Sequence, residues 1–223
     1  MKSKWLHKKK TAGLIIFCNG WGMDEHPVRF LQGDQYDVLM LYDYSSIVPD
    51  IDLQQLFVEY TSVVLVSWSM GVWAGQQLFA GCPDVFATTI AINGTLCPID
   101  DQYGIPEKTV RATLANFDEK GRLKFYSRMF RDRELYRDFL KQQPRRSVAD
   151  QRNELAALLE SAVCKVEEDL VYTTAIVSSR DLIMPTKNQL RFWPEKRVKQ
   201  VDGSHFLFYS YDSWDELITK AEG

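Results

Sequence analysis

Short runs of branched apolar residues alternate with helical or turn-rich stretches along most of the chain. The runs predict buried strands at residues 13–18, 36–42, 63–67, 85–92, 171–177 and 197–201. Helices are expected at 72–80, at 211–221 and, with a turn-rich crossover as the alternative, at 49–60. Because near-continuous apolar strands are typical of sheets buried on both faces, this alternation predicts a mostly parallel sheet in a three-layer α/β fold.

The strand pattern stops between residues 105 and 163, where apolar residues such as Leu123, Tyr126 and Phe130 recur at helical spacing. We therefore expect a small helical cap insertion at 105–163 and a core formed by 1–104 and 164–223. Residues 105–152 carry thirteen Lys or Arg and seven Asp or Glu, whereas the whole chain has a net charge of −3. A basic segment in an acidic protein is either a solvated helical face or a docking surface for an acidic partner.

The composition is that of an ordinary globular protein. Its 223 residues, 45% of them hydrophobic, suffice for one well-cored domain with an insertion. No apolar run approaches the ~20 residues that span a bilayer, and the N-terminus lacks the apolar middle of a signal peptide, so we expect a cytoplasmic protein with no membrane or nucleic-acid partner.

The cysteines at 18, 82, 97 and 164 are widely separated, which predicts reduced core thiols and argues against a metal site. No cofactor is expected.

The most informative motif is Ser67-Trp-Ser-Met-Gly71, which lies between the strand at 63–67 and the helix at 72–80. A strand, a sharp turn and a helix in this order are typical of a nucleophile elbow, with Ser69 at the apex of the turn. The strand and the helix pass close together there, so the positions two before and two after the apex must be small. Ser67 and Gly71 meet that need, and Ser69 is the predicted nucleophile.

Two further loops carry the partners that a serine nucleophile needs. Asp181 follows the strand at 171–177 and His205 follows the strand at 197–201, so both are expected at the carboxyl edge of the sheet, beside Ser69. A histidine accepts the serine proton, and a carboxylate orients the imidazole and stabilises its cation. The chain order serine, acid, histidine is that of the α/β-hydrolases.

The acid and the histidine each have alternatives. Asp202 is nearer to His205 in the sequence, but an Asp-Gly pair is typical of a turn, so Asp181 is favoured. His7 lies in a basic arm and His26 lies beside a proline, and neither follows a predicted strand. A structural role for His205 in the core stays open at this point.

The loop Asn19-Gly-Trp-Gly22 follows the first predicted strand. Glycines at such a point allow a tight turn whose N–H groups face the space above the sheet. We expect an oxyanion hole made of the backbone N–H groups of Trp21 and Met70. Trp21, Trp68 and Phe125 are candidates for lining an apolar acyl channel, although aromatic residues at such positions also serve as packing.

With these motifs, the chain resembles the BioG family of pimeloyl-[acyl-carrier protein] methyl ester esterases over nearly its full length. The resemblance is carried by Asn19-Gly-Trp-Gly-Met23, Ser67-Trp-Ser-Met-Gly71, Ile92-Asn-Gly-Thr95, Lys124-Phe-Tyr-Ser-Arg-Met-Phe130, Arg180-Asp181 with Pro185, and Gly203-Ser-His205. It implies an α/β-hydrolase fold, with Ser69, Asp181 and His205 as the triad. It also implies hydrolysis of the methyl ester of pimeloyl-[acyl-carrier protein] to the carboxylate and methanol, in biotin precursor synthesis.

An acyl carrier protein is therefore the expected partner, and its acidity suits the basic insertion, where Phe125 and Arg128 are candidate substrate contacts. Only twelve residues precede the first predicted strand, so a somewhat reduced sheet is expected. Two other functions stay open. The same triad serves an acyl thioesterase or a carboxylesterase for small esters, and a hydrolase fold can also belong to a non-catalytic binding protein.

Overall fold

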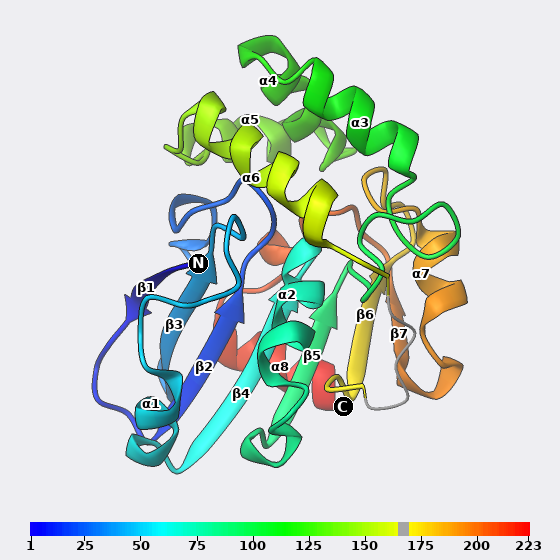
Figure 1. Cartoon of the computed structure of the whole chain (residues 1–223). Coiled ribbons are helices and arrows are strands. Elements are labelled where there is room, and N and C mark those ends of the chain that lie inside the picture. Colours follow the sequence, from blue (N-terminus) through cyan, green and yellow to red (C-terminus); the bar gives the residue numbers. More distant parts are fainter. Residues whose placement is uncertain (165–169) are drawn as a thin grey trace.

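The computed structural model describes residues 1–164 and 170–223, and within them the strands form one seven-stranded sheet of order β1-β3-β2-β4-β5-β6-β7 (Figure 1). The strands are β1 (Lys2–His7), β2 (Gly13–Cys18), β3 (Tyr36–Tyr42), β4 (Ser62–Trp68), β5 (Thr88–Ile92), β6 (Thr174–Ser178) and β7 (Val198–Val201). β1 pairs antiparallel with β3, and all other pairs are parallel. The carboxyl ends of β2 to β7 therefore meet at one edge of the sheet.

The helices divide into two groups. Those that flank the sheet are α1 (Leu53–Glu59), α2 (Met70–Phe79), α7 (Thr186–Phe192) and α8 (Trp214–Glu222), and α2 and α8 lie on opposite faces (Figure 1). The others, which we call the cap helices, are α3 (Glu107–Ala115), α4 (Glu119–Arg128), α5 (Arg133–Lys141) and α6 (Val148–Ser161). The cap helices follow β5 in the chain and lie beyond the carboxyl ends of the strands, at the top of Figure 1.

The local sequence explains where these elements begin. All six residues of β2 are buried, as a strand between two helical layers requires. Most longer helices begin at a side chain that accepts a backbone N–H of the first turn, namely Asp52, Asp118, Asp132, Ser147 and Ser213. α2 follows Ser69, which provides no side-chain cap. Its first N–H groups are therefore available to a group bound above the sheet.

The parallel three-layer architecture predicted from the sequence is confirmed. β2 and β3 begin and end where their apolar runs do, whereas β5 begins at Thr88 rather than 85 and β6 at Thr174 rather than 171. The pattern does not predict β1 or α7. β1 is an edge strand with only two apolar residues, Trp5 and Leu6, and α7 is only seven residues long. Among the described residues, no helix is long and apolar enough to cross a membrane.

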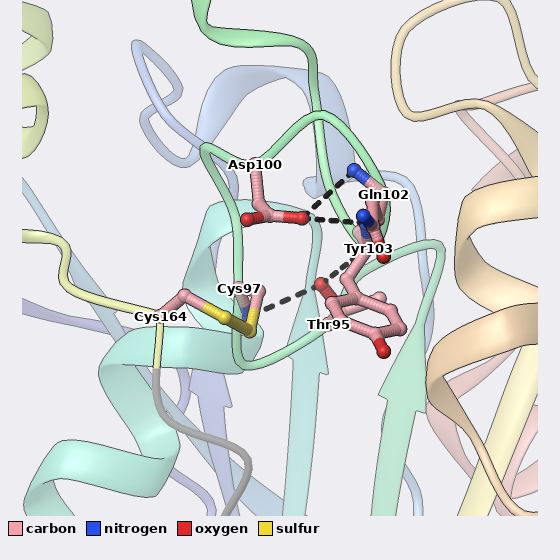
Figure 2. Close-up of a disulfide and its surroundings, with 6 residues drawn as sticks. All are labelled: Thr95, Cys97, Asp100, Gln102, Tyr103 and Cys164. Carbon is pink, nitrogen blue, oxygen red and sulfur yellow. Dashed lines mark hydrogen bonds between the residues drawn. A yellow bond between two sulfur atoms is a disulfide. The ribbon is translucent and has the colours of Figure 1, made fainter.

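The prediction of four reduced cysteines is wrong for two of them. Cys97 and Cys164 form a disulfide, shown with its surroundings in Figure 2. Cys97 lies between β5 and α3, and Cys164 lies just after α6, so the bond joins the segments that lead into and out of the cap helices. Widely spaced cysteines gave no sign of this pairing, because the fold brings together positions 67 residues apart.

The loop that holds Cys97 is ordered by its own hydrogen bonds (Figure 2). Thr95 Oγ1 accepts the Cys97 N–H and donates to the carbonyl of Tyr103, and Asp100 accepts the N–H groups of Gln102 and Tyr103. The other two cysteines are free thiols. Burial raises the pKa of Cys18 to about 12, so its thiol stays protonated and unreactive.

Reduction of the Cys97–Cys164 bond is expected to lower the free energy of unfolding by about 4 kcal/mol, because a closed loop of this length restricts the unfolded chain. Urea unfolding with and without dithiothreitol measures the difference. The double variant Cys97→Ser/Cys164→Ser is the control, and its midpoint should not respond to the reductant. Equal midpoints for the oxidised and reduced wild-type protein would contradict the prediction.

Candidate active site

Ser69 occupies the turn between β4 and α2, and its backbone is strained. Its φ of 56° and ψ of −125° lie in a region that residues other than glycine rarely adopt. The turn fits sterically only because small residues surround it. A Cβ at Gly71 would overlap the carbonyl oxygens of Cys18 and Asn19, and a Cβ at Gly94 would overlap the Ser69 carbonyl oxygen. The turn therefore pushes the Ser69 side chain up from the carboxyl edge of the sheet, as the elbow motif predicts.

The side chains of His205 and Asp181 complete a hydrogen-bonded chain with Ser69. His205 Nε2 lies 3.0 Å from Ser69 Oγ, and His205 Nδ1 lies 2.7 Å from Asp181 Oδ2. Because a carboxylate accepts at Nδ1, we assign the ring proton to Nδ1, which leaves Nε2 to accept the serine proton. All three residues are buried. The three loops that the sequence places at one sheet edge thus bring their side chains into contact.

Neighbouring groups fix both Asp181 and His205. Asp181 Oδ1 accepts the backbone N–H groups of Ile183 and Met184 at 2.8 and 3.0 Å, and Gln189 Nε2 donates to Oδ2 at 3.0 Å. The His205 carbonyl accepts hydrogen bonds from Trp68 Nε1 at 3.0 Å and from Asn93 Nδ2 at 2.9 Å. These contacts fix the position of the carboxylate and hold the imidazole beside the serine.

The alternative residues lie elsewhere. Asp202 is exposed and pairs with Arg180 at 2.8 Å. His7 Nε2 contacts the carbonyl of Leu31 at 2.7 Å, and the His26 ring is 3.0 Å from Asp24. None of these three takes part in the chain of contacts at Ser69, so the structure separates them from the candidate site.

One group of side chains has the composition of a metal site. Asp24, Glu25 and His26 place one ligand atom each within 4.8 Å of one another. The Asp24 carboxylate is already engaged, because its oxygens accept the backbone N–H groups of His26 at 3.0 Å and Arg145 at 2.7 Å. We therefore assign no metal site to this group.

The residues expected to donate to an oxyanion lie beside Ser69. Gly20 to Met23 form a turn that is closed by the Met23 N–H and the Gly20 carbonyl at 3.3 Å. Gly22 has a φ of 74°, as the third residue of a type II turn requires. Trp21 therefore stands at the corner, and it lines the same cavity as Ser69 and Met70. Among the described residues, the backbone N–H groups of Trp21 and Met70 have no protein acceptor.

The cavity at Ser69 is closed in this conformation. It has a volume of about 10 Å³, which is about the least that holds one water molecule. Trp21 and Phe125 cover it, and their ring centroids are 4.8 Å apart. Both also line an adjacent cavity of about 30 Å³. A cavity of this size is too small to hold an acyl chain.

A groove of about 690 Å³ lies between α3 and α4. Phe125 lines the groove and both inner cavities, so the three adjoin at its side chain. Arg128 lines the groove, and its Nη2 donates to the Leu182 carbonyl at 2.9 Å. The basic side chains along the groove are those of Lys108, Lys120, Lys124 and Arg128. Trp68 lines only the cavity at Ser69, where its ring lies against that of His205.

A buried polar cluster that the sequence pattern does not predict lies beside the Gly20–Met23 turn. Its centre is the ion pair of Arg146 and Glu154, whose Nη1 and Oε2 atoms are 2.6 Å apart. Burial raises the pKa of Glu154, and the charge of Arg146 acts against that shift. Burial disfavours the charge of Arg146, but Glu154, Asp150 and Asp43 outweigh it and raise the pKa of the guanidinium. The sequence signal for this cluster was the presence of polar residues on a leucine-rich helix face.

Comparison with known proteins connects the chain with one family. Residues 1–217 match the model of the family described as pimeloyl-ACP methyl esterase BioG. A Haemophilus influenzae protein described as uncharacterized is 34% identical over 223 residues, which cover 97% of this chain and 99% of that protein. The crystal structure of BioG from H. influenzae has a TM-score of 0.87 and 32% identity, covering 96% of this chain and 98% of that one.

A further relative is longer than this chain. Malonyl-[acyl-carrier protein] O-methyltransferase of Bacteroides fragilis is 35% identical over 194 residues, and the match covers 86% of this chain but 39% of that protein. Solved structures below 25% identity share the fold alone. They include a peroxisomal alpha-beta-hydrolase of Saccharomyces cerevisiae with a TM-score of 0.56 and 15% identity, covering 96% of this chain and 76% of that one. The fold predicted from the sequence, that of the α/β-hydrolases, is confirmed.

Proposed function

The chain belongs to the BioG family of esterases, and on that premise we propose that it hydrolyses the methyl ester of pimeloyl-[acyl-carrier protein] to the carboxylate and methanol, in biotin precursor synthesis. The observation that carries the proposal is the buried chain of contacts from Ser69 through His205 to Asp181. A serine, a histidine and a carboxylate in this order are the groups that transfer an acyl group from an ester to water.

In the proposed reaction, His205 Nε2 takes the proton of Ser69 as the hydroxyl oxygen attacks the ester carbonyl. The backbone N–H groups of Trp21 and Met70 bind the negative oxygen of the tetrahedral intermediate. His205 then gives the proton to the departing methoxide, which leaves as methanol. Water repeats the sequence on the acyl-enzyme and releases the carboxylate, while Asp181 keeps the imidazole oriented throughout.

Two features support a carrier-bound methyl ester as the substrate. The path from Ser69 passes apolar side chains and ends in a basic groove, which suits an acyl chain attached to an acidic carrier. The B. fragilis relative is named for methylating an acid on an acyl carrier protein, and an esterase for a carrier-bound methyl ester removes such a group. The domain limits 1–104, 105–163 and 164–223 belong to this proposal, with the cap helices as the part that meets the carrier.

Mass spectrometry of the carrier tests the reaction. Pimeloyl-carrier methyl ester incubated with the wild-type protein should lose the mass of one methylene group, which is the difference between the ester and the acid. A thioesterase would instead release the free carrier thiol, and a non-catalytic protein would leave the mass unchanged. Either of these two results would contradict the proposed function, and a carrier that lost its methyl group would exclude both alternatives.

The arginines of α5 and of the turn before it are expected to guide the carrier to the protein. Arg131, Arg133 and Arg137 are exposed around a second groove at the α4–α5 turn. Reversing their charge to Glu should raise KM for the carrier-bound ester about tenfold, because attraction of an acidic partner is lost. Steady-state kinetics at low ionic strength measure the effect.

The matched control reverses the charge of exposed lysines that lie outside the cap helices, at Lys8 and Lys196. This variant should keep its KM for the carrier-bound ester, and both variants should hydrolyse a small soluble ester at the wild-type rate. Equal losses on the two substrates would show that the arginines act through the fold rather than through the carrier.

A further inference from the structure

The cap helix α6 holds the turn that carries the Trp21 N–H. The Gly22 N–H donates to Glu154 Oε2 at 3.1 Å, and the Gly22 carbonyl accepts from Gln151 Nε2 at 2.6 Å. The indole Nε1 of Trp21 donates to the Gln151 carbonyl at 2.8 Å. Gln151 and Glu154 are three residues apart and therefore share one face of the helix. α6 therefore binds the backbone N–H and carbonyl of Gly22 and the indole of Trp21.

Glu154 is itself held in place. Its side chain is fully buried, Oε1 accepts the Tyr44 N–H at 2.9 Å, and Oε2 pairs with Arg146 at 2.6 Å. The Tyr44 hydroxyl donates to the Asn19 carbonyl at 2.5 Å, so it binds the residue before the turn. A buried carboxylate is stable only where such partners satisfy it. Each oxygen of Glu154 therefore has a defined position, and the Gly22 N–H is bound to a fixed point.

Gln151 is fixed in the same way. Its Nε2 donates to the Tyr126 hydroxyl at 2.8 Å as well as to the Gly22 carbonyl. Tyr126 belongs to α4, so the contact ties α4, α6 and the turn together. A side chain at position 22 would be strained, because φ is positive there and a Cβ would come within 3.3 Å of Gln151 Nε2.

We propose that Gln151 and Glu154 are positioning residues for the esterase reaction, which set the direction of the Trp21 N–H toward the developing oxyanion. The proposal rests on the proposed function, in which Trp21 is an oxyanion donor. The Trp21 N–H belongs to the peptide group of the Gly20 carbonyl, inside the turn that α6 holds. Donors of an oxyanion hole lower the barrier only when they are already aligned. The cap therefore acts in the chemical step as well as in substrate access.

The test uses Gln151→Met, which keeps the size of the side chain and removes its donor to the Gly22 carbonyl. With p-nitrophenyl butyrate, kcat should fall about 10- to 100-fold and KM should stay within about twofold. Affinity for a trifluoromethyl ketone should fall by the same factor as kcat, because its adduct with Ser69 places an oxyanion between the Trp21 and Met70 N–H groups. A loss of folding stability alone would not produce this parallel loss.

Asp150→Asn is the matched control. Asp150 lies on the same helix and pairs with Arg146 at 2.6 Å, but it has no contact with the turn. This variant should keep kcat and the ketone affinity within about twofold of wild type. Glu154→Gln should resemble Gln151→Met, and thermal unfolding is measured beside the kinetics because the substitution also weakens the pair with Arg146.

Two results would overturn the positioning role. One is a Gln151→Met protein with wild-type kcat and ketone affinity, and the other is an equal loss in Asp150→Asn. Failure of the proposed function is a different result, in which the wild-type protein hydrolyses no ester or Ser69→Ala hydrolyses it equally well. If Glu154→Gln does not fold, Gln151→Met still decides the matter, because it leaves the ion pair intact.

Discussion

Ser69→Ala should lower the turnover of pimeloyl-carrier methyl ester by a factor of about 10⁴ or more. The substitution removes the hydroxyl oxygen that lies 3.0 Å from His205 Nε2. Alanine is no larger than serine, and the glycines that make room for the turn are unchanged in this variant. The fold should therefore survive, and the thermal unfolding temperature should be unchanged. Mass spectrometry of the carrier and labelling by a fluorophosphonate measure the loss.

Ser67→Ala is the control for this loss. Ser67 is buried in the same strand, two residues before the nucleophile, and its hydroxyl contacts that of Tyr172 at 2.9 Å. Tyr172 keeps a second acceptor in the Val72 carbonyl at 2.8 Å. Ser67→Ala should therefore retain turnover and labelling. Turnover of Ser69→Ala within tenfold of wild type would refute the assignment of the nucleophile.

Asp181→Asn should lower kcat by about 10³- to 10⁴-fold at neutral pH. An amide N–H in place of Oδ2 faces His205 Nδ1 and favours the ring form that carries its proton on Nε2, which then cannot accept from Ser69. The amide oxygen can still accept the N–H groups of Ile183 and Met184. We therefore expect a folded protein with a weak nucleophile, measured as kcat on a small soluble ester.

Asp202→Asn tests the alternative that Asp202, rather than Asp181, is the acid that orients His205. Asp202 is exposed, pairs with Arg180 and has no contact with His205, and an exposed ion pair contributes little to stability. This variant should retain the wild-type kcat. The reverse outcome, with a loss in Asp202→Asn and none in Asp181→Asn, would mean that the two aspartates have been assigned the wrong way round.

The sequence predicts the chain of contacts at Ser69 because each member follows a strand of one parallel sheet. Such strands end at the same edge, so the order of elements alone brings Ser69, Asp181 and His205 near each other. The small residues of the elbow add a local signal, since only a close approach of strand and helix requires them. No long-range contact has to be known for this prediction.

Other features depend on contacts that no local pattern reveals. The hydrogen bond between Gly22 and Glu154 joins residues 132 positions apart, and neither residue type indicates the other. The disulfide was not predicted for the same reason, because a cysteine in an apolar run has the same local sequence whether or not it has a partner across the fold. Closure of the cavity depends on how Phe125 of α4 packs against Trp21, which spacing within α4 does not determine.

The Cys97–Cys164 bond holds together the two ends of the segment that carries the cap helices. The Cα atoms of the two cysteines are 4.1 Å apart, so the segment between them leaves and rejoins the hydrolase core at nearly one point. A core whose insertion begins and ends together accepts replacement of that insertion without a change in strand order. We expect cap helices of a relative to be accepted between these two positions only where the graft supplies its own residues to hold the turn at Gly22.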